Sequence, residues 1–222
     1  LSMIVHKMVA CSLAYPKLFI LSPNVRIERR EKACTKIHAY EFTQLDFEVR
    51  DATSEDIRSL VEKLLCGLIK SLRQDLKDEL TFLGRAHSLN VPSTPFKVYN
   101  RKELECKYGK EWAAKMVMEA QEPFWVTNIP REFYDFENFN SGEWDNYDLI
   151  LPKYGEVLSG SRREWSYQKI VKKMKRDKVN KASFRLLLNL AKRGKIKPSA
   201  GAGIGMERLV SWIAGAKHIG ET

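Results

Sequence analysis

Residues 40–50 alternate between two faces of different chemical character. One face is largely apolar, and the other combines aromatic, amide and acidic side chains, namely Tyr40, Phe42, Gln44, Asp46 and Glu48. A period of two predicts a β-strand. The apolar face is typical of a protein core, whereas unpaired acids and an amide would be costly to bury. The polar face therefore lies either in solvent or along a ligand cleft, and its aromatic residues favour the cleft.

A helical period follows directly after this strand. Thr53 and Asp56 have the spacing of a capping box, which predicts the start of a helix. The apolar residues after it recur at helical spacing, and they are Ile57, Leu60, Val61, Leu64, Leu65, Leu68 and Leu72. This stripe predicts a long helix that packs on the core.

The rest of the pattern predicts an antiparallel sheet flanked by helices, hence an α+β fold. Further helices are expected over residues 3–14, 101–120, 164–178 and 181–192. Strands are expected over residues 17–27, 95–99, 124–128, 144–151 and 154–161. The first of these strands should be broken at Ser22-Pro23, and residues 73–93 have the character of a connector.

Gly201, Gly203 and Gly205 recur at spacing two, so a strand there would have one face without side chains. The bare face fits either a flat ligand or close packing, and the glycines alone favour neither. Glu207 and Arg208 follow where the strand should turn into a helix, and an arginine at that position suits a phosphate tail. The spacing matches neither the dinucleotide-binding fingerprint nor the P-loop.

Asp148 and Glu156 lie symmetrically about a predicted turn at Pro152-Lys153, so we expect them to be near cross-strand neighbours. Two acids so placed repel each other unless a cation lies between them. Arg162 or Arg163 could supply that cation, and Mg²⁺ is the functional alternative.

Composition limits the class of protein. The chain has 222 residues with 44% hydrophobic and 30% charged residues, which is enough for one sizeable core. No apolar run approaches the roughly 20 residues of a membrane span. The four cysteines have no C-x-x-C spacing, so we expect reduced thiols in a cytoplasmic protein. The net charge of +10 permits nucleic-acid binding, but residues 169–178 are more typical of a solvated helix face.

Three separated motifs carry a family resemblance. G-A-G-I-G-M-E-R, ending at Arg208, resembles the third signature motif of class II aminoacyl-tRNA synthetases. Residues 19–49 resemble the second motif, and Tyr147-Asp148 through G-E-V-L-S-G-S-R-R-E resembles the metal and substrate strands of the aspartyl/asparaginyl subgroup. The resemblance implies a single class II catalytic domain over residues 1–222. We expect the chain to lack the first motif and the C-terminal tail of the family, and the complete protein to be a homodimer.

The resemblance also implies the binding of ATP and Mg²⁺. Arg26 would bridge the reacting carboxylate and the α-phosphate, and Phe42 and Arg208 would enclose the adenine, with Arg208 reaching the γ-phosphate. The other residues expected at ATP are Glu28, His38, Glu156, Gly203 and Gly205. Oxygen ligands for Mg²⁺ would come from Asp148, Glu156 and Ser159. At the amino acid, Asp46 and Ser2 suit the ammonium group. Gln44, Lys7 and Arg163 suit carboxylates, and Ser159 is also expected at the substrate.

Two further stretches, N-I-P-R-E-F-Y-D and K-P-S-A-G-A-G-I-G, resemble the archaeal asparagine synthetase that is related to asparaginyl-tRNA synthetase. Ile4, Ser199 and residues 133–142 depart from the synthetase pattern. We therefore expect tRNA-independent conversion of aspartate, ATP and ammonia into asparagine, through an acyl-adenylate. The alternative is the catalytic core of an asparaginyl-tRNA synthetase, with tRNA as a partner. A non-catalytic paralogue is a third hypothesis, against which Arg26, Glu156 and Arg208 argue.

Overall fold

The computed structural model describes residues 3–26 and 39–222 of the chain. Its helices are α1 (Met3–Leu13), α2 (Ser54–Asp75), α3 (Lys77–Phe82), α4 (Arg101–Tyr108), α5 (Trp112–Glu119), α6 (Tyr167–Arg176), α7 (Arg185–Lys192) and α8 (Met206–Ala214). Its strands are β1 (Lys17–Val25), β2 (Glu41–Arg50), β3 (Lys97–Asn100), β4 (Phe124–Thr127), β5 (Glu137–Asn138), β6 (Glu143–Trp144), β7 (Asn146–Leu151), β8 (Gly155–Arg162) and β9 (Ser199–Gly205). Short 3₁₀ turns cover Gly109–Glu111, Lys181–Phe184 and Ile219–Glu221.

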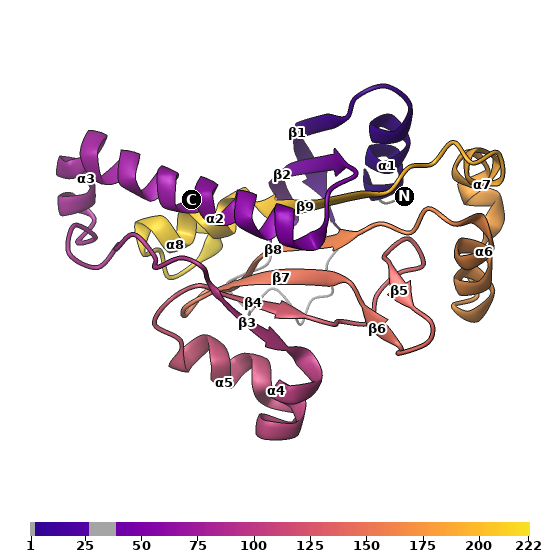
Figure 1. Cartoon of the computed structure of the whole chain (residues 1–222). Helices are drawn as coiled ribbons and strands as arrows, with labels where there is room; N and C mark the ends of the chain where they lie inside the picture. The colour runs from indigo at the N-terminus through magenta and orange to yellow at the C-terminus, as the bar shows by residue number, and fades with distance from the viewer. Residues whose placement is uncertain (1–2, 27–38) are drawn as a thin grey trace.

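A seven-stranded sheet in the order β1-β2-β9-β8-β7-β4-β3 forms the centre of the molecule (Figure 1). Its neighbouring strands are antiparallel, apart from the parallel pair β3 and β4 at one edge. The α+β fold predicted from the sequence is confirmed, and the sheet is mixed where we expected it to be wholly antiparallel. Strands β5 and β6 form a separate two-stranded sheet.

Helix α2 covers one face of the sheet, and Ile57, Val61 and Leu65 of its apolar stripe pack in the main core (Figure 1). Leu60 and Leu64, also expected in that stripe, are exposed. The capping box is present, since Thr53 Oγ1 accepts from the N–H of Asp56 and the Asp56 carboxylate accepts from the N–H of Thr53. The alternate residues Phe47, Ala202 and Ile204 pack in the same core. The apolar faces of β2 and β9 therefore lie toward α2.

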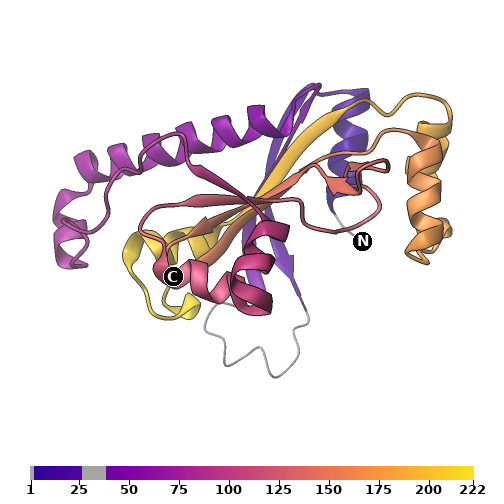
Figure 2. The same ribbon diagram turned by 60° about the horizontal axis from the view of Figure 1, so that its bottom comes forward.

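The opposite face of the sheet carries the polar residues of β2 and the glycines of β9. Helix α1 contacts β1, β2 and β9, and it packs in a second core together with α6 and α7. Figure 2 shows α6 and α7 at the far end of the molecule from α3. Helices α4 and α5 form a third core with β4 and β7. This layout leaves the polar side of β2, β9, β8 and β7 free to form a cleft.

Two expected local features differ in the structure. Strand β1 runs unbroken through Ser22-Pro23, with Pro23 opposite Thr43. Proline is tolerated there because β1 is an edge strand and needs donors on one side only. The helix expected over residues 101–120 is divided at Gly109, whose φ of +73° ends α4.

The described cysteines Cys11, Cys66 and Cys106 are free thiols, and burial raises the pKa of Cys11 to about 11. No helix in the described ranges combines the length and apolar character that a membrane crossing requires.

Candidate active site

The three glycines of β9 serve two purposes. A Cβ at Gly201 would lie 2.2 Å from both Glu48 Oε2 and the Phe47 carbonyl oxygen, so close packing excludes a side chain there. A Cβ at Gly203 would approach Asp46 Oδ1 and Gln44 Nε2 at 3.0 Å, and at Gly205 the nearest atom would be 3.8 Å away. Gly203 and Gly205 therefore form a bare floor, as a flat ligand requires, whereas Gly201 has a packing role.

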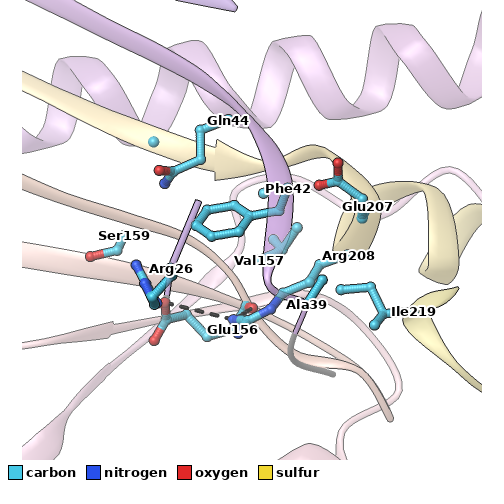
Figure 3. Close-up of a pocket in the computed structure, with 12 residues that line it drawn as sticks. Arg26, Ala39, Phe42, Gln44, Glu156, Val157, Ser159, Glu207, Arg208 and Ile219 are labelled. Carbon is cyan, nitrogen blue, oxygen red and sulfur yellow. Dashed lines mark hydrogen bonds and ion pairs between the residues drawn. The ribbon is translucent and has the colours of Figure 1, made fainter. Parts of the chain in front are cut away.

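A first cavity of about 110 Å³ lies against this floor (Figure 3). The residues that line it include most of those expected at ATP, namely Arg26, Phe42, Glu156, Gly203, Gly205 and Arg208. Gln44, Ser159 and Glu207 line it as well. The Arg26 guanidinium carbon lies 5.1 Å from the centroid of the Phe42 ring and covers one of its faces. Residues from β2, β8, β9 and α8, together with Arg26 directly after β1, thus converge on one cavity, although they are far apart in the sequence.

Arg208 lies in the first turn of α8, where β9 ends. Its Nη1 donates to the carbonyl oxygen of Glu156 at 2.7 Å, and the Glu156 carboxylate lies 4.0 Å from the same nitrogen. The Oε1 of Glu207 accepts from the N–H of Thr43 at 2.7 Å and ties the start of α8 to β2. Arg208 is therefore held at the mouth of the cavity, and its side chain stays 27% exposed.

A second, larger cavity of about 500 Å³ adjoins the first, because Arg26, Gln44, Glu156, Ser159 and Gly203 line both. Its lining also contains the charged side chains Lys7, Asp46, Arg131, Glu132, Asp135 and Arg163. The two cavities form one cleft, with a nearly neutral aromatic end and a strongly charged end.

Lys7 and Asp46 meet in the second cavity. Lys7 Nζ donates to Asp46 Oδ1 at 2.5 Å and to the Ala202 carbonyl oxygen at 3.3 Å, and Lys7 is 2% exposed. Burial and the positive charge of Arg163 lower the pKa of Lys7, against the attraction of Asp46 and Glu48. We expected these two residues to bind opposite ends of the amino acid, and the structure pairs them with each other.

Arg163 is a second buried cation of the cleft, 2% exposed. It donates through Nε to Glu48 Oε1 at 3.2 Å and through Nη1 to Asp135 Oδ1 at 2.9 Å. Burial alone would lower its pKa, but Glu48 and Asp135 outweigh burial and raise it. Ser199 Oγ donates to the same Glu48 at 2.8 Å. Arg163 and its two carboxylates form a closed ionic network beneath the second cavity.

Asp148 bonds to Arg131, a residue to which the sequence analysis gave no role. Both oxygens of Asp148 accept from Arg131 Nη2, and Ser159 Oγ accepts from Nη1. The expected symmetry of Asp148 and Glu156 is wrong, because an irregularity at Leu149/Ile150 places Asp148 opposite Ser159 and Glu156 opposite Ile150. Burial and the repulsion of Glu156 raise the pKa of Asp148 to about 7, although Arg131 opposes that shift.

Glu156 is an accessible carboxylate of the cleft that could hold a divalent cation. The Glu156 side chain is 47% exposed and faces the first cavity, whereas Asp148 and Ser159 are engaged by Arg131. No group of three or more candidate metal-binding side chains occurs among the described residues. Mg²⁺ is commonly held by one or two carboxylates together with substrate phosphates, and Glu156 fits that use. The three-ligand set expected from the sequence stays a prediction.

The structure brings most predicted site residues together, and three predictions lie outside its described residues: Ser2, Glu28 and His38. Arg131 and Asp135 were missed, although both occur in the quoted stretch N-I-P-R-E-F-Y-D. Glu48 stands in the polar row of β2 already recognised in the sequence. The motifs recognised in the sequence therefore include these residues, but the sequence did not predict which of them form ion pairs.

The chain is similar to known proteins over almost its full length. Residues 2–222 match the family of class II tRNA synthetases for D, K and N. Curated relatives include the asparagine–tRNA ligases of Thermoplasma acidophilum, 28% identical over 92% of this chain, and of Mesomycoplasma hyopneumoniae, 30% identical over 95%. This chain covers 51% and 52% of those proteins, so it spans about half their length.

Solved structures agree with these relatives. The asparaginyl-tRNA synthetase from Pyrococcus horikoshii, complexed with asparaginyl-adenylate, superposes with a TM-score of 0.87 at 25% identity. The match covers 98% of this chain and 54% of that one. The asparaginyl-tRNA synthetase of Entamoeba histolytica superposes with the same TM-score at 24% identity. That match covers 98% of this chain and 54% of the Entamoeba chain, and at this identity it supports the fold alone.

These matches correct the function expected from the sequence. The similar proteins are named as tRNA ligases, so the expected tRNA-independent synthesis of asparagine from aspartate and ammonia is wrong, and the alternative reading fits better. The structure explains why two departures misled us. Ser199 supports Glu48 inside the ionic network, and Phe133 packs in a core against Phe184 at 4.9 Å. The residues at both positions are explained by local packing and hydrogen bonding, so they give no information about the nitrogen source of the reaction.

Proposed function

This chain belongs to the class II tRNA synthetases for D, K and N, and we propose that it is the catalytic core of an asparaginyl-tRNA synthetase. It would activate asparagine with ATP and transfer it to tRNA. The observation that carries the proposal is the continuous cleft, in which Arg26, Phe42 and Arg208 surround a glycine floor beside a chamber of paired charges. The names of its relatives supply the amino acid and the acceptor.

The first step joins two anions. An oxygen of the asparagine α-carboxylate attacks the α-phosphorus of ATP, the bond from that phosphorus to the bridging oxygen breaks, and pyrophosphate leaves with the electron pair. Positioning and neutralisation of charge dominate catalysis of such a step. Arg26 lines both cavities, so its guanidinium is placed to contact carboxylate and α-phosphate together.

The remaining groups hold the nucleotide. Phe42 offers an aromatic face for the adenine, and Gly203 and Gly205 let the ligand lie against the backbone. Arg208 stands at the cavity mouth, where its remaining donors suit the phosphate tail. Glu156 would hold Mg²⁺, which would neutralise the charge of the phosphates.

The charged end of the cleft favours a neutral side chain. In its described part, the buried Lys7 and Arg163 and the partly buried Arg131 are each bonded to protein carboxylates, and these partners are Asp46, Glu48, Asp135 and Asp148. A further carboxylate from aspartate would bring a negative charge to a place where these cations already have carboxylate partners, and burying an unmatched charge is costly. An amide adds no charge. This balance supports asparagine as the substrate.

Asparagine-dependent exchange between ATP and labelled pyrophosphate tests the proposal. We expect exchange with asparagine to exceed exchange with aspartate by at least about 10²-fold, as expected when the wrong substrate brings an unmatched buried charge. Labelled aspartate with ammonium should give no free asparagine. Preferred exchange with aspartate would reject the assignment of the amino acid.

Use of tRNA, dimerisation and a cytoplasmic location remain proposals for the whole protein.

A further inference from the structure

A third cavity, of about 340 Å³, lies beside the first one. The turn between β7 and β8, helix α8 and the segment after α8 enclose it. Arg208 and Ile219 line the first and third cavities alike, so they form a shared wall, and both are visible at the edge of the first cavity in Figure 3. The first and third cavities therefore lie on either side of Arg208 and Ile219.

Positive charge dominates the lining of the third cavity. Lys153, Arg208 and Lys217 line it together with His218, and no aspartate or glutamate occurs among its described lining residues. The nearby Glu221 accepts from the backbone N–H of Lys217 at 3.0 Å. His218 Nδ1 accepts from the N–H of Gly220 at 2.9 Å, which leaves the proton of the neutral imidazole on Nε2 as a donor. Donors thus surround this space.

Ser211 gives a second and independent indication of a ligand. It lines the cavity from α8 and is 5% exposed, and its Oγ has no hydrogen-bond partner among the described residues. Buried hydroxyl groups in native proteins nearly always have a partner. An acceptor held in the cavity would provide one.

We propose that the third cavity binds a phosphate-type anion and receives the pyrophosphate that leaves ATP. Multiple donors, three basic side chains and an unpartnered hydroxyl suit the many acceptor oxygens of a condensed phosphate. Arg208 connects the place where the phosphate tail is held to the place where the product would lie. The source of the pyrophosphate rests on the proposed function, whereas the existence of the anion site does not.

Equilibrium binding of labelled pyrophosphate to the 222-residue chain, at constant ionic strength, tests the site. Lys217→Gln should weaken binding about tenfold and Ser211→Ala about fivefold, as expected for the loss of a charged and a neutral donor. Lys192→Gln, an equal change of charge at an exposed position on α7, should leave it unchanged. AMP lacks the outer phosphates, so its affinity should stay the same in all three variants.

The thermal midpoint shows that the variants are folded. Lys217 is exposed and Ser211 Oγ has no partner to lose, so neither change should lower the midpoint. Pyrophosphate binding that is unchanged in both variants, an equal loss of AMP binding, or displacement of pyrophosphate by equimolar sulfate would each overturn the site. Loss of asparagine-dependent exchange alone, with pyrophosphate binding intact in the wild type, would reject the proposed function and leave the anion site standing.

Discussion

Glu48→Gln is the most informative change to the charged end of the cleft. Glu48 is fully buried and accepts three contacts from Arg163, at 3.2, 3.3 and 3.4 Å, and one from Ser199 at 2.8 Å. Glutamine keeps the shape and most acceptors but removes the charge. Two charges about 4 Å apart attract by about 4 kcal/mol at the effective dielectric of a protein site.

Two terms reduce that figure. Asp135 stays bonded to Arg163 at 2.9 Å, and glutamine is cheaper to bury than glutamate. We therefore expect Glu48→Gln to lower the free energy of unfolding by about 2–3 kcal/mol in urea titrations. Glu105→Gln is the matched control, because Glu105 forms a partly exposed pair with Arg101 at 2.6 Å on one helix, and such a pair is worth about 0.3–0.5 kcal/mol.

The same variant should change substrate choice. Without Glu48, the described cleft has one negative charge fewer beside Arg163, so a carboxylate side chain is better tolerated. The ratio of asparagine-dependent to aspartate-dependent pyrophosphate exchange should therefore fall by about tenfold or more, since a factor of ten needs only about 1.4 kcal/mol. A stability loss no larger than that of Glu105→Gln, together with an unchanged ratio, would refute the charge-balance reasoning.

Three further predictions concern the rest of the cleft. Arg208→Ala and Glu156→Ala should each slow asparagine-dependent pyrophosphate exchange by at least about 10²-fold, the scale for losing one charge partner of a transition state; near-normal exchange in both would reject their assignment to the phosphate tail. Phe42→Ala should raise the KM for ATP and leave that for asparagine nearly unchanged in steady-state assays, whereas a lower thermal midpoint with an unaltered KM would make Phe42 a packing residue. Urea unfolding should show stability falling as pH rises from about 4 to 7, because burial and Glu156 raise the pKa of folded Asp148 to about 7 while the unfolded chain releases that proton near pH 4. Asp148→Asn should flatten this slope, and an identical slope would contradict the shift.

Local patterns in the sequence predicted the frame of the site well. The polar row of β2, the glycine floor of β9 and the capped helix α2 all depend on short-range spacing, and the structure contains each of them. The arrangement of Arg208 after the glycines also follows from chain order, because a strand that turns directly into a helix fixes where the next side chain lies. Such features need no knowledge of the partner strands.

The features that sequence could not supply depend on long-range pairing. The Lys7–Asp46 bond spans 39 positions and the Arg163–Glu48 network spans 115. The irregularity at Leu149/Ile150 shifts Asp148 away from Glu156, and no local signal marks it. Arg131 reaches Asp148 from a loop that follows β4. Which charges neutralise one another is decided by this packing, and the proposed preference for asparagine over aspartate rests on it.

The fate of the α-phosphate tests the central claim most directly. The chain, in excess over ATP labelled at the α-phosphorus, would be mixed with that ATP, Mg²⁺ and asparagine in the absence of tRNA. The products would be separated after a single turnover. Attack at the α-phosphorus predicts label in an enzyme-bound asparaginyl-adenylate, with unlabelled pyrophosphate released. Label recovered in ADP, or no adenylate above that of an Arg26→Ala variant, would contradict the account of this cleft as a site of amino-acid activation.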